Sequence, residues 1–100
     1  MGPSGIYEIV NIVNGRRYIG SAVDFKKRWK THRHLLANGK HHSIHLQRAW
    51  DEDGGANFKF APLMTEPYFG DLVWWEQRFL GALRPEYNIS LDASAPMKGR

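Results

Sequence analysis

Two short stretches rich in β-branched and aromatic residues stand near the N-terminus, with a turn signal between them. Residues 5–12 contain Ile, Val and Tyr in a strand-like pattern, and residues 16–22 form a second such stretch. The dipeptide Asn14-Gly15 separates them, and this dipeptide strongly favours a tight turn between antiparallel strands. The pattern therefore predicts a β-hairpin.

The length of the hairpin loop decides whether Tyr7 and Tyr18 share a face of the sheet. A four-residue loop, 12–15, pairs Asn11 with Arg16 and places both tyrosines on one face, about 7 Å apart along the strands. A two-residue loop keeps them on one face but roughly 13 Å apart, and a three-residue loop places them on opposite faces. A shared site requires one face and favours the four-residue loop; otherwise the tyrosines simply pack or lie on the sheet surface.

Capping residues and apolar residues at helical spacing predict three helices in the rest of the chain. The expected helices are 25–37 between Asp24 and Gly39, a second one between Ser43 and Gly54, and 69–83 before Pro85. Between the last two, residues 57–64 begin with strand-like alternation, and Pro62 restricts this strand to a sheet edge or a bulge. Residues 87–89 are expected to form a short extended piece, and residues 93–100 a basic tail.

Composition narrows the class of protein. The 100 residues are enough for one domain with a modest core, taken here as residues 1–92. Fourteen Lys and Arg against ten Asp and Glu give a net charge of +4, which favours a polyanionic partner. The chain has no cysteine, which excludes disulfides, thiolate zinc sites and a cysteine nucleophile. No apolar run approaches about 18 residues, so we expect a soluble intracellular protein.

Arg28 and His32 are candidate phosphate-binding residues on the first predicted helix. Their spacing of four residues places both on one helix face. A guanidinium donates two parallel hydrogen bonds to phosphate, and an imidazole can donate a hydrogen bond or move a proton. The alternative is a solvated basic face, because four other basic residues lie on the same helix: Lys26, Lys27, Lys30 and Arg33.

Glu76 stands inside the apolar stripe of the third predicted helix. The other members of this stripe are apolar: Leu72, Phe79, Leu80 and Leu83. A carboxylate on a buried stripe needs a cationic partner, because an unpaired buried charge is unfavourable. That partner is either a hard cation such as Mg²⁺, which binds carboxylate oxygens, or a basic residue such as Arg78 or Arg84.

Five histidines raise the alternative of a zinc site: His32, His34, His41, His42 and His45. The predicted helix start at Ser43 divides them, and neither cysteine nor an acidic ligand accompanies them. We therefore expect surface and substrate-facing histidines instead of zinc ligands.

The two strings Gly5-Ile6-Tyr7 and Tyr18-Ile19-Gly20, with ten residues between them, resemble the signature of GIY-YIG endonucleases. The resemblance covers about residues 4–90, and residues 39–48 resemble the intron-encoded homing endonucleases in particular. The functional positions of the family match Tyr7, Tyr18, Arg28, His32, His41, Glu76 and Asn88, with His42 a near rival to His41.

This resemblance implies an α/β (α+β) fold, a three-stranded antiparallel sheet flanked by three or more helices. It implies hydrolysis of a DNA phosphodiester by water with one divalent metal ion, Mg²⁺ or Mn²⁺, held by Glu76. Tyr7 is then the general base or positions the water, and Tyr18 orders the water or the phosphate. Arg28 and His32 stabilise phosphate charge, and Asn88 supports the site through hydrogen bonds.

The implied partner is DNA, and no membrane is involved. Expected DNA contacts are Lys26, Lys27, Lys30, Arg33 and His42. Homing members usually carry further DNA-binding modules downstream, so we expect an excised or minimal catalytic domain, monomeric, in the cytoplasm, nucleoid or phage-infected cell. The alternatives are a repair, restriction or branch-processing nuclease of the same family, and a non-catalytic nucleic-acid-binding module.

Overall fold

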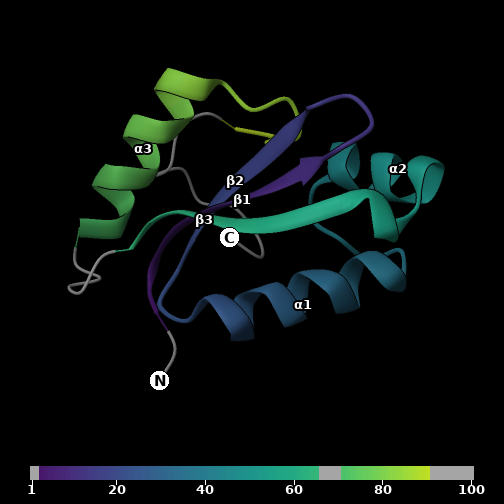
Figure 1. Cartoon of the computed structure of the whole chain (residues 1–100), viewed down its shortest axis with the longest axis horizontal. Helices are drawn as coiled ribbons and strands as arrows, with labels where there is room; N and C mark the ends of the chain where they lie inside the picture. The colour runs from purple at the N-terminus through teal and green to yellow at the C-terminus, as the bar shows by residue number, and fades with distance from the viewer. Residues whose placement is uncertain (1–2, 66–70, 91–100) are drawn as a thin grey trace.

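The computed structural model describes residues 3–65 and 71–90 and is built on a three-stranded antiparallel sheet in the order β2-β1-β3. In chain order the elements are β1 (Gly5–Asn11), β2 (Arg17–Ala22), α1 (Phe25–Ala37), α2 (Ile44–Asp53), the 3₁₀ turn η1 (Gly55–Asn57), β3 (Phe58–Thr65) and α3 (Leu72–Leu83). Helices α1 and α3 lie on opposite sides of the sheet, and α2 lies near the end where β3 begins (Figure 1). The predicted fold class is confirmed.

The hairpin between β1 and β2 has the four-residue loop that a shared tyrosine site requires. The Asn11 N–H donates to the Arg16 carbonyl at 2.9 Å, and Ile9 lies opposite Tyr18. The Asn11 side chain accepts a hydrogen bond from the Val13 N–H at 3.0 Å, which starts the turn. Gly15 completes it with φ +75°, a left-handed conformation that glycine adopts without steric strain.

The two helices that follow begin at the predicted caps. The Asp24 carboxylate accepts a hydrogen bond from the Lys27 N–H at 3.3 Å, and the Ser43 hydroxyl accepts one from the Leu46 N–H at 3.2 Å. These bonds satisfy main-chain donors that have no partner within the helix. Helix α1 ends at Ala37 as predicted, ahead of Gly39 at φ +69°. The expected start of the third helix falls on residues 69 and 70, which lie outside the described residues.

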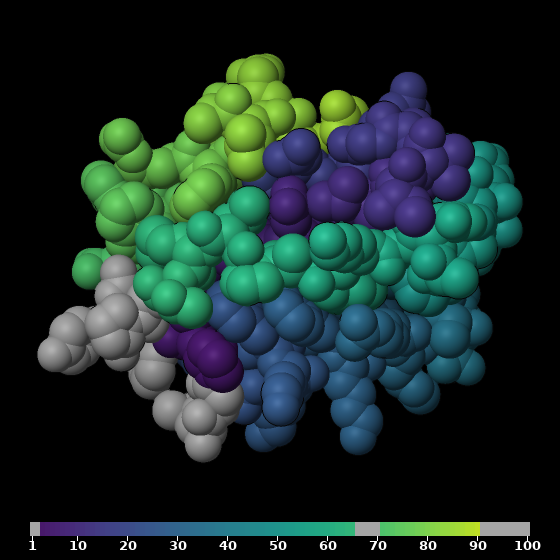
Figure 2. Space-filling model, viewed as in Figure 1, coloured from purple at the N-terminus to yellow at the C-terminus, as the bar shows by residue number. Residues whose placement is uncertain are grey.

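Strand β3 lies at an edge of the sheet and contains Pro62, as predicted. The pairing with β1 shifts between Ile6, opposite Met64, and Tyr7, opposite Pro62, so that Leu63 is an extra residue in a bulge. Proline has no N–H to donate to a neighbouring strand, and an edge position beside a bulge tolerates this. In Figure 2, β3 crosses the visible face between α1 below and α3 above.

Residues 87–89 form a turn and a bend, not the extended piece that the sequence predicted. The segment nevertheless lies along β2, since the Tyr87 N–H donates to the Arg17 carbonyl at 3.0 Å. Pro85 and the left-handed Arg84, at φ +45°, turn the chain away from α3 before this contact. The proposed basic tail, 93–100, lies outside the described residues, and the domain boundary at residue 92 stays a prediction.

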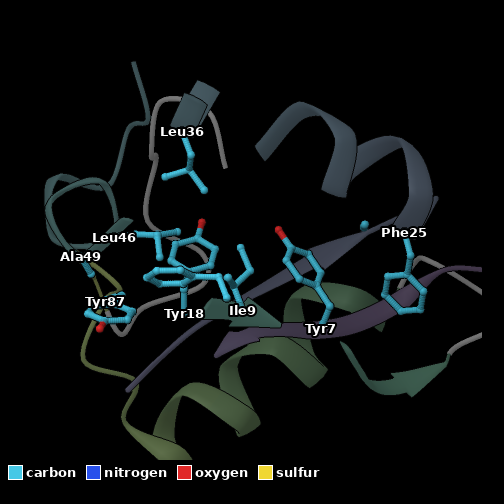
Figure 3. Close-up of a cluster of buried hydrophobic side chains, with 10 residues drawn as sticks. Tyr7, Ile9, Tyr18, Phe25, Leu36, Leu46, Ala49 and Tyr87 are labelled. Atoms are coloured by element: carbon cyan, nitrogen blue, oxygen red, sulfur yellow. The ribbon is translucent and has the colours of Figure 1, made fainter. Parts of the chain in front are cut away.

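Two separate hydrophobic clusters cover the two faces of the sheet. The cluster on the α1 and α2 side contains both tyrosines of the hairpin, and Figure 3 shows them with their neighbours: Tyr7, Ile9, Tyr18, Phe25, Leu36, Leu46, Ala49 and Tyr87. The other cluster consists of Ile6, Ile19, Leu72 and Leu80 on the α3 side. Tyr7 and Tyr18 thus face α1 and α2. Within the described part of the chain, no helix is long and apolar enough to cross a membrane.

Candidate active site

Gly20 leaves the space in which the Tyr7 phenol lies. The two residues are opposite one another in the β1–β2 pair. A Cβ atom on Gly20 would lie 2.5 Å from the Tyr7 hydroxyl oxygen, a distance that real Cβ atoms do not reach. The Tyr7 ring therefore lies directly over the backbone of β2, and its side chain is completely buried.

Gly5 has a steric role on the other side of β1. At φ +151° it adopts a conformation that favours glycine, and a Cβ atom there would lie 1.9 Å from the Met64 carbonyl oxygen. Glycine therefore permits the close approach of β1 to β3. Gly5 and Gly20 are thus both required for the packing of the sheet that carries Tyr7 and Tyr18.

A chain of hydrogen bonds connects Tyr7 to two histidines. The Tyr7 hydroxyl is hydrogen-bonded to His32 Nε2, and His32 Nδ1 lies 2.7 Å from His41 Nε2. His41 Nδ1 in turn accepts a hydrogen bond from the Ser43 N–H at 3.0 Å. His32 comes from α1, whereas His41 and Ser43 come from the loop that precedes α2.

Tyr18 has its own histidine partner. Its hydroxyl lies 3.0 Å from His42 Nε2, and the rings of His41 and His42 stack with centroids 4.3 Å apart. From the sequence, either His41 or His42 could be the site histidine that precedes the second helix. The structure brings both to the tyrosines, one joined to Tyr7 through His32 and the other joined to Tyr18.

Of the expected surface and substrate-facing histidines, His32 and His41 are not surface residues, since they are 2% and 8% exposed. His34 and His45 are exposed as expected. The described residues contain no group of three or more His, Cys, Asp or Glu side chains that could hold a metal ion. Both ring nitrogens of His32 and of His41 are engaged in the hydrogen-bond chain.

Gln47 holds the loop that carries His41, a role that was not predicted from the sequence. Its Oε1 accepts a hydrogen bond from the His41 N–H at 3.1 Å, and its Nε2 donates to the Leu36 carbonyl at 3.0 Å. The same Nε2 also donates to Asp51 at 2.9 Å. Gln47 thereby ties the loop to the last turn of α1, the helix that carries His32. The feature that could have indicated this role is the position of Gln47 in the first turn of α2, where its side chain is buried.

Arg28 acts on Tyr7 from the same helix as His32. A hydrogen bond and the positive charge of Arg28 lower the pKa of Tyr7, but burial and the neighbouring Tyr18 raise that pKa, and the net shift is upward. Arg28 also lines an open hollow of about 280 Å³, beside Ser21, Lys27 and Thr31. It thus connects the buried tyrosine to a surface that a phosphate group can reach.

Glu76 is buried on α3, with 3% of its surface exposed, one turn from both Leu72 and Leu80. Its negative charge contributes to the raised pKa of Tyr7, so the two side chains influence each other electrostatically. A single buried carboxylate suits Mg²⁺, which binds through one or two carboxylates and completes its shell with water and substrate phosphate. The donor set does not suit zinc, which takes three or four protein ligands.

Asn88 closes the free edge of β2. Its side-chain Nδ2 donates to the Ile19 carbonyl at 2.8 Å, and its Oδ1 accepts from the Ile19 N–H at 2.8 Å. The amide therefore pairs with both main-chain groups of Ile19, as a neighbouring strand would. This geometry favours a supporting role for Asn88, since it fixes the residue between Tyr18 and Gly20.

The basic residues of α1 lie on different sides of the helix. Lys27 lines the hollow of Arg28 and, together with Lys26 and Lys30, a second open hollow of about 440 Å³. Arg33 instead places its guanidinium 4.1 Å from the centre of the Phe60 ring, on the side of β3. Of the four, Lys27 alone lines the hollow that contains Arg28.

The buried histidines make the stability of the fold sensitive to acid. Burial is the main cause that lowers the pKa of His32 to about 2 and that of His41 to about 4, and neighbouring positive charge adds to both shifts. An unfolded histidine has a pKa of about 6.5, so below that pH the unfolded chain binds protons that the folded chain does not. Stability therefore falls as the pH decreases below about 6.5.

We expect the free energy of unfolding to be roughly 2–4 kcal/mol smaller at pH 5 than at pH 7, measured by urea denaturation. His32→Gln should reduce this difference, whereas a change of the exposed His45 to Gln serves as the control. Equal stability of the natural chain at the two pH values would contradict the burial of neutral histidines.

Comparisons with known proteins agree with this site. Residues 3–88 match the GIY-YIG catalytic domain. The chain is 45% identical over 76 residues to intron-associated endonuclease 1 of Enterobacteria phage T4, a match that covers 76% of this chain and 31% of that protein. The chain thus spans about a third of the length of this relative.

Two solved structures resemble the whole fold. The catalytic domain of homing endonuclease I-TevI has a TM-score of 0.81 and 40% identity, covering 87% of this chain and 98% of that one. A mutant of the catalytic domain of intron endonuclease I-TevI has a TM-score of 0.84 and 39% identity, covering 94% and 99%. The chain therefore belongs to the GIY-YIG family, and its residues 3–88 form a GIY-YIG nuclease catalytic domain.

Proposed function

We propose that this domain is a divalent-metal-dependent DNA endonuclease of the homing type. The observation that carries the proposal is the Tyr7 hydroxyl, buried and hydrogen-bonded to His32, with Arg28 beside it. A catalytic domain of a nuclease family needs a base and a cation near one phosphate, and this arrangement supplies both. The homing type is favoured by the relatives, one named an intron-associated endonuclease and one a homing endonuclease.

Tyr7 is proposed to lose its phenol proton to solvent water and then, as the phenolate, to take the proton from the attacking water at the same oxygen. Burial raises the pKa of Tyr7, which opposes ionisation, whereas Arg28 stabilises the phenolate. In the proposed step Arg28 also neutralises charge that develops on the phosphate, as a preorganised donor in a water-poor site. Tyr18, hydrogen-bonded to His42, orders the water or the scissile phosphate.

Glu76 is the proposed metal-binding residue. GIY-YIG nucleases generally use a divalent metal, and the buried carboxylate of Glu76 fits Mg²⁺ or Mn²⁺, one ion per site. When bound, such an ion would offset negative charge on the phosphate and on the leaving oxygen. His41 and Asn88 position the tyrosines, His41 through His32 and Asn88 through the edge of β2.

DNA is the proposed substrate, held mainly through its phosphates. Lys27 lies beside Arg28 in one hollow, and Lys26 and Lys30 extend the positive surface along α1. Such contacts bind the backbone and do not by themselves read the base sequence. Because the match covers 31% of the phage relative, we propose that a separate DNA-binding module selects the target site.

The test is nicking of supercoiled plasmid by the 100-residue chain. We expect nicked and linear product in the presence of Mg²⁺ and none when EDTA removes the divalent metal, because the phosphate charge is then left without its cation. Restoration of cleavage by excess Mg²⁺ is the control for nonspecific effects of EDTA. Cleavage that continues undiminished in EDTA would refute the dependence on metal.

A further inference from the structure

The hydrogen bonds that lead to Tyr7 start from a group that can only donate. The main-chain N–H of Ser43 donates to His41 Nδ1 at 3.0 Å, so this nitrogen must carry a lone pair. A neutral imidazole holds its one hydrogen on the other nitrogen, here His41 Nε2. The Ser43 amide therefore fixes which tautomer His41 adopts.

The same reasoning extends to His32. His41 Nε2–H lies 2.7 Å from His32 Nδ1 and donates to it, so His32 Nδ1 is an acceptor. The hydrogen of His32 is then on Nε2, the atom bonded to the Tyr7 hydroxyl. Along this chain of hydrogen bonds, Ser43 donates to His41, His41 to His32, and His32 to Tyr7.

We propose that the Ser43 main-chain N–H, through His41, holds His32 as a fixed hydrogen-bond donor to the Tyr7 oxygen. His32 is then not the base that removes the Tyr7 proton, because a lone pair at His32 Nε2 would require a hydrogen on Nδ1. That hydrogen would face the hydrogen of His41 Nε2. Tyr7 receives a donor from His32, and its own hydrogen points away from the histidines.

A second consequence is that neither histidine can take another proton while the bonds hold. His41 Nδ1 faces the Ser43 N–H, and His32 Nδ1 faces His41 Nε2–H, so both vacant positions face hydrogens. The burial of both rings, which lowers the pKa of each, acts in the same direction. A donor to the Tyr7 oxygen stabilises the phenolate over the phenol, which is the form a base requires.

Ser43 and Gln47 are thus positioning residues. Ser43 is the N-cap of α2, so no bond within the helix requires its N–H. Gln47 accepts a hydrogen bond from the His41 N–H and keeps the ring at the distance that the Ser43 amide needs. The catalytic role of this arrangement rests on the proposed function. The assignment of the two histidine tautomers does not depend on that function.

The first experiment is ¹⁵N NMR of the histidine rings in the labelled 100-residue chain at neutral pH. Protonated and unprotonated ring nitrogens have widely different shifts, so the spectrum identifies each tautomer directly. We expect His32 and His41 both neutral with hydrogen on Nε2. Hydrogen on Nδ1 of either ring, or a charged ring, overturns the proposal even if the chain cleaves DNA.

The second experiment compares Ser43→Pro with Ser43→Ala. Proline removes the main-chain N–H at a residue whose φ of −89° is close to the proline range, whereas alanine keeps the N–H and removes only the hydroxyl. We expect Ser43→Ala to keep both tautomers and Ser43→Pro to give a mixture at His41. Plasmid cleavage by Ser43→Pro should be at least about tenfold slower than by Ser43→Ala, because orientation of the acid–base groups is lost.

Identical tautomers in the two variants would overturn the role of the Ser43 amide. If Ser43→Pro does not fold, the spectrum of the unmodified chain still decides the proposal. Absence of cleavage by the unmodified chain would count against the proposed function, and the ring spectra would still test the hydrogen-bond chain.

Discussion

Glu76→Gln is expected to abolish plasmid cleavage while the domain stays folded. The neutral amide binds a hard divalent cation poorly, so a site that depends on the Glu76 carboxylate loses its metal. Glutamine keeps the shape of the side chain and removes a charge that is 3% exposed, so thermal stability should be retained. DNA binding should persist or become tighter, because one negative charge near the phosphates is removed.

The same variant tests the alternative that Glu76 is half of a structural ion pair. In that case the change leaves a buried cation without its partner, which typically costs about 3–5 kcal/mol. For a domain of this size the melting temperature would fall by more than about 10 °C. Glu52→Gln, which changes an exposed carboxylate on α2, is the matched control for both measurements. An unstable Glu76→Gln variant, or one that still cuts, would refute the metal role.

Gly20→Ala is expected to damage both stability and cleavage. The added Cβ would lie 2.5 Å from the Tyr7 hydroxyl oxygen and 2.6 Å from the adjacent ring carbon, so the Tyr7 ring must move. Tyr7 is fully buried, and forcing an extra group into a packed core typically costs about 1–3 kcal/mol. We expect the melting temperature to fall by roughly 5–20 °C. Any displacement of Tyr7 also separates its hydroxyl from His32, which should slow cleavage.

Gly81→Ala is the control for this substitution. Gly81 lies within α3, is exposed, and has no atom within 4 Å of an added Cβ. Alanine favours the helix over glycine by up to about 1 kcal/mol, so this variant should be as stable as the natural chain or more stable. Plasmid cleavage by Gly20→Ala is compared with Gly81→Ala at a temperature where both are folded. Equal rates would show that Tyr7 does not need its position over Gly20.

Much of the local structure follows from signals within a few residues. Asn14-Gly15 predicted the turn between β1 and β2 but left the length of its loop open. The structure decided on four residues, with the Asn11 side chain bonded to the Val13 N–H, and this loop places Tyr7 and Tyr18 on one face because side chains alternate along a strand. Asp24 and Ser43 determine where α1 and α2 begin, since a capping side chain bonds to an N–H three residues later. Pro62 determines that its strand lies at an edge, because proline lacks the N–H.

The buried position of Glu76 was also determined by the sequence, through the apolar stripe on its helix. The position of Glu76 relative to Tyr7 was not determined by the sequence. Helix α3 packs on the opposite face of the sheet from α1, and helical periodicity does not indicate which face of a sheet a helix covers. Likewise, the spacing of Arg28 and His32 predicted a shared helix face. It did not predict that His32 is buried and neutral, which depends on burial and on neighbouring charges.

The tertiary structure alone decided the chemistry of the histidines. His32 and Tyr7 are 25 residues apart, and the partner of His41 on its other side is a main-chain N–H, which no residue type in the sequence reveals. Asn88 reaches Ile19 across 69 residues and pairs with its backbone, so its role depends on an edge strand that only the folded sheet defines. Local sequence determines secondary structure through short-range hydrogen bonds and sterics. The bond of His32 to Tyr7 and the lowered pKa values of His32 and His41 depend instead on burial and on contacts between separate segments, which form only when the chain packs.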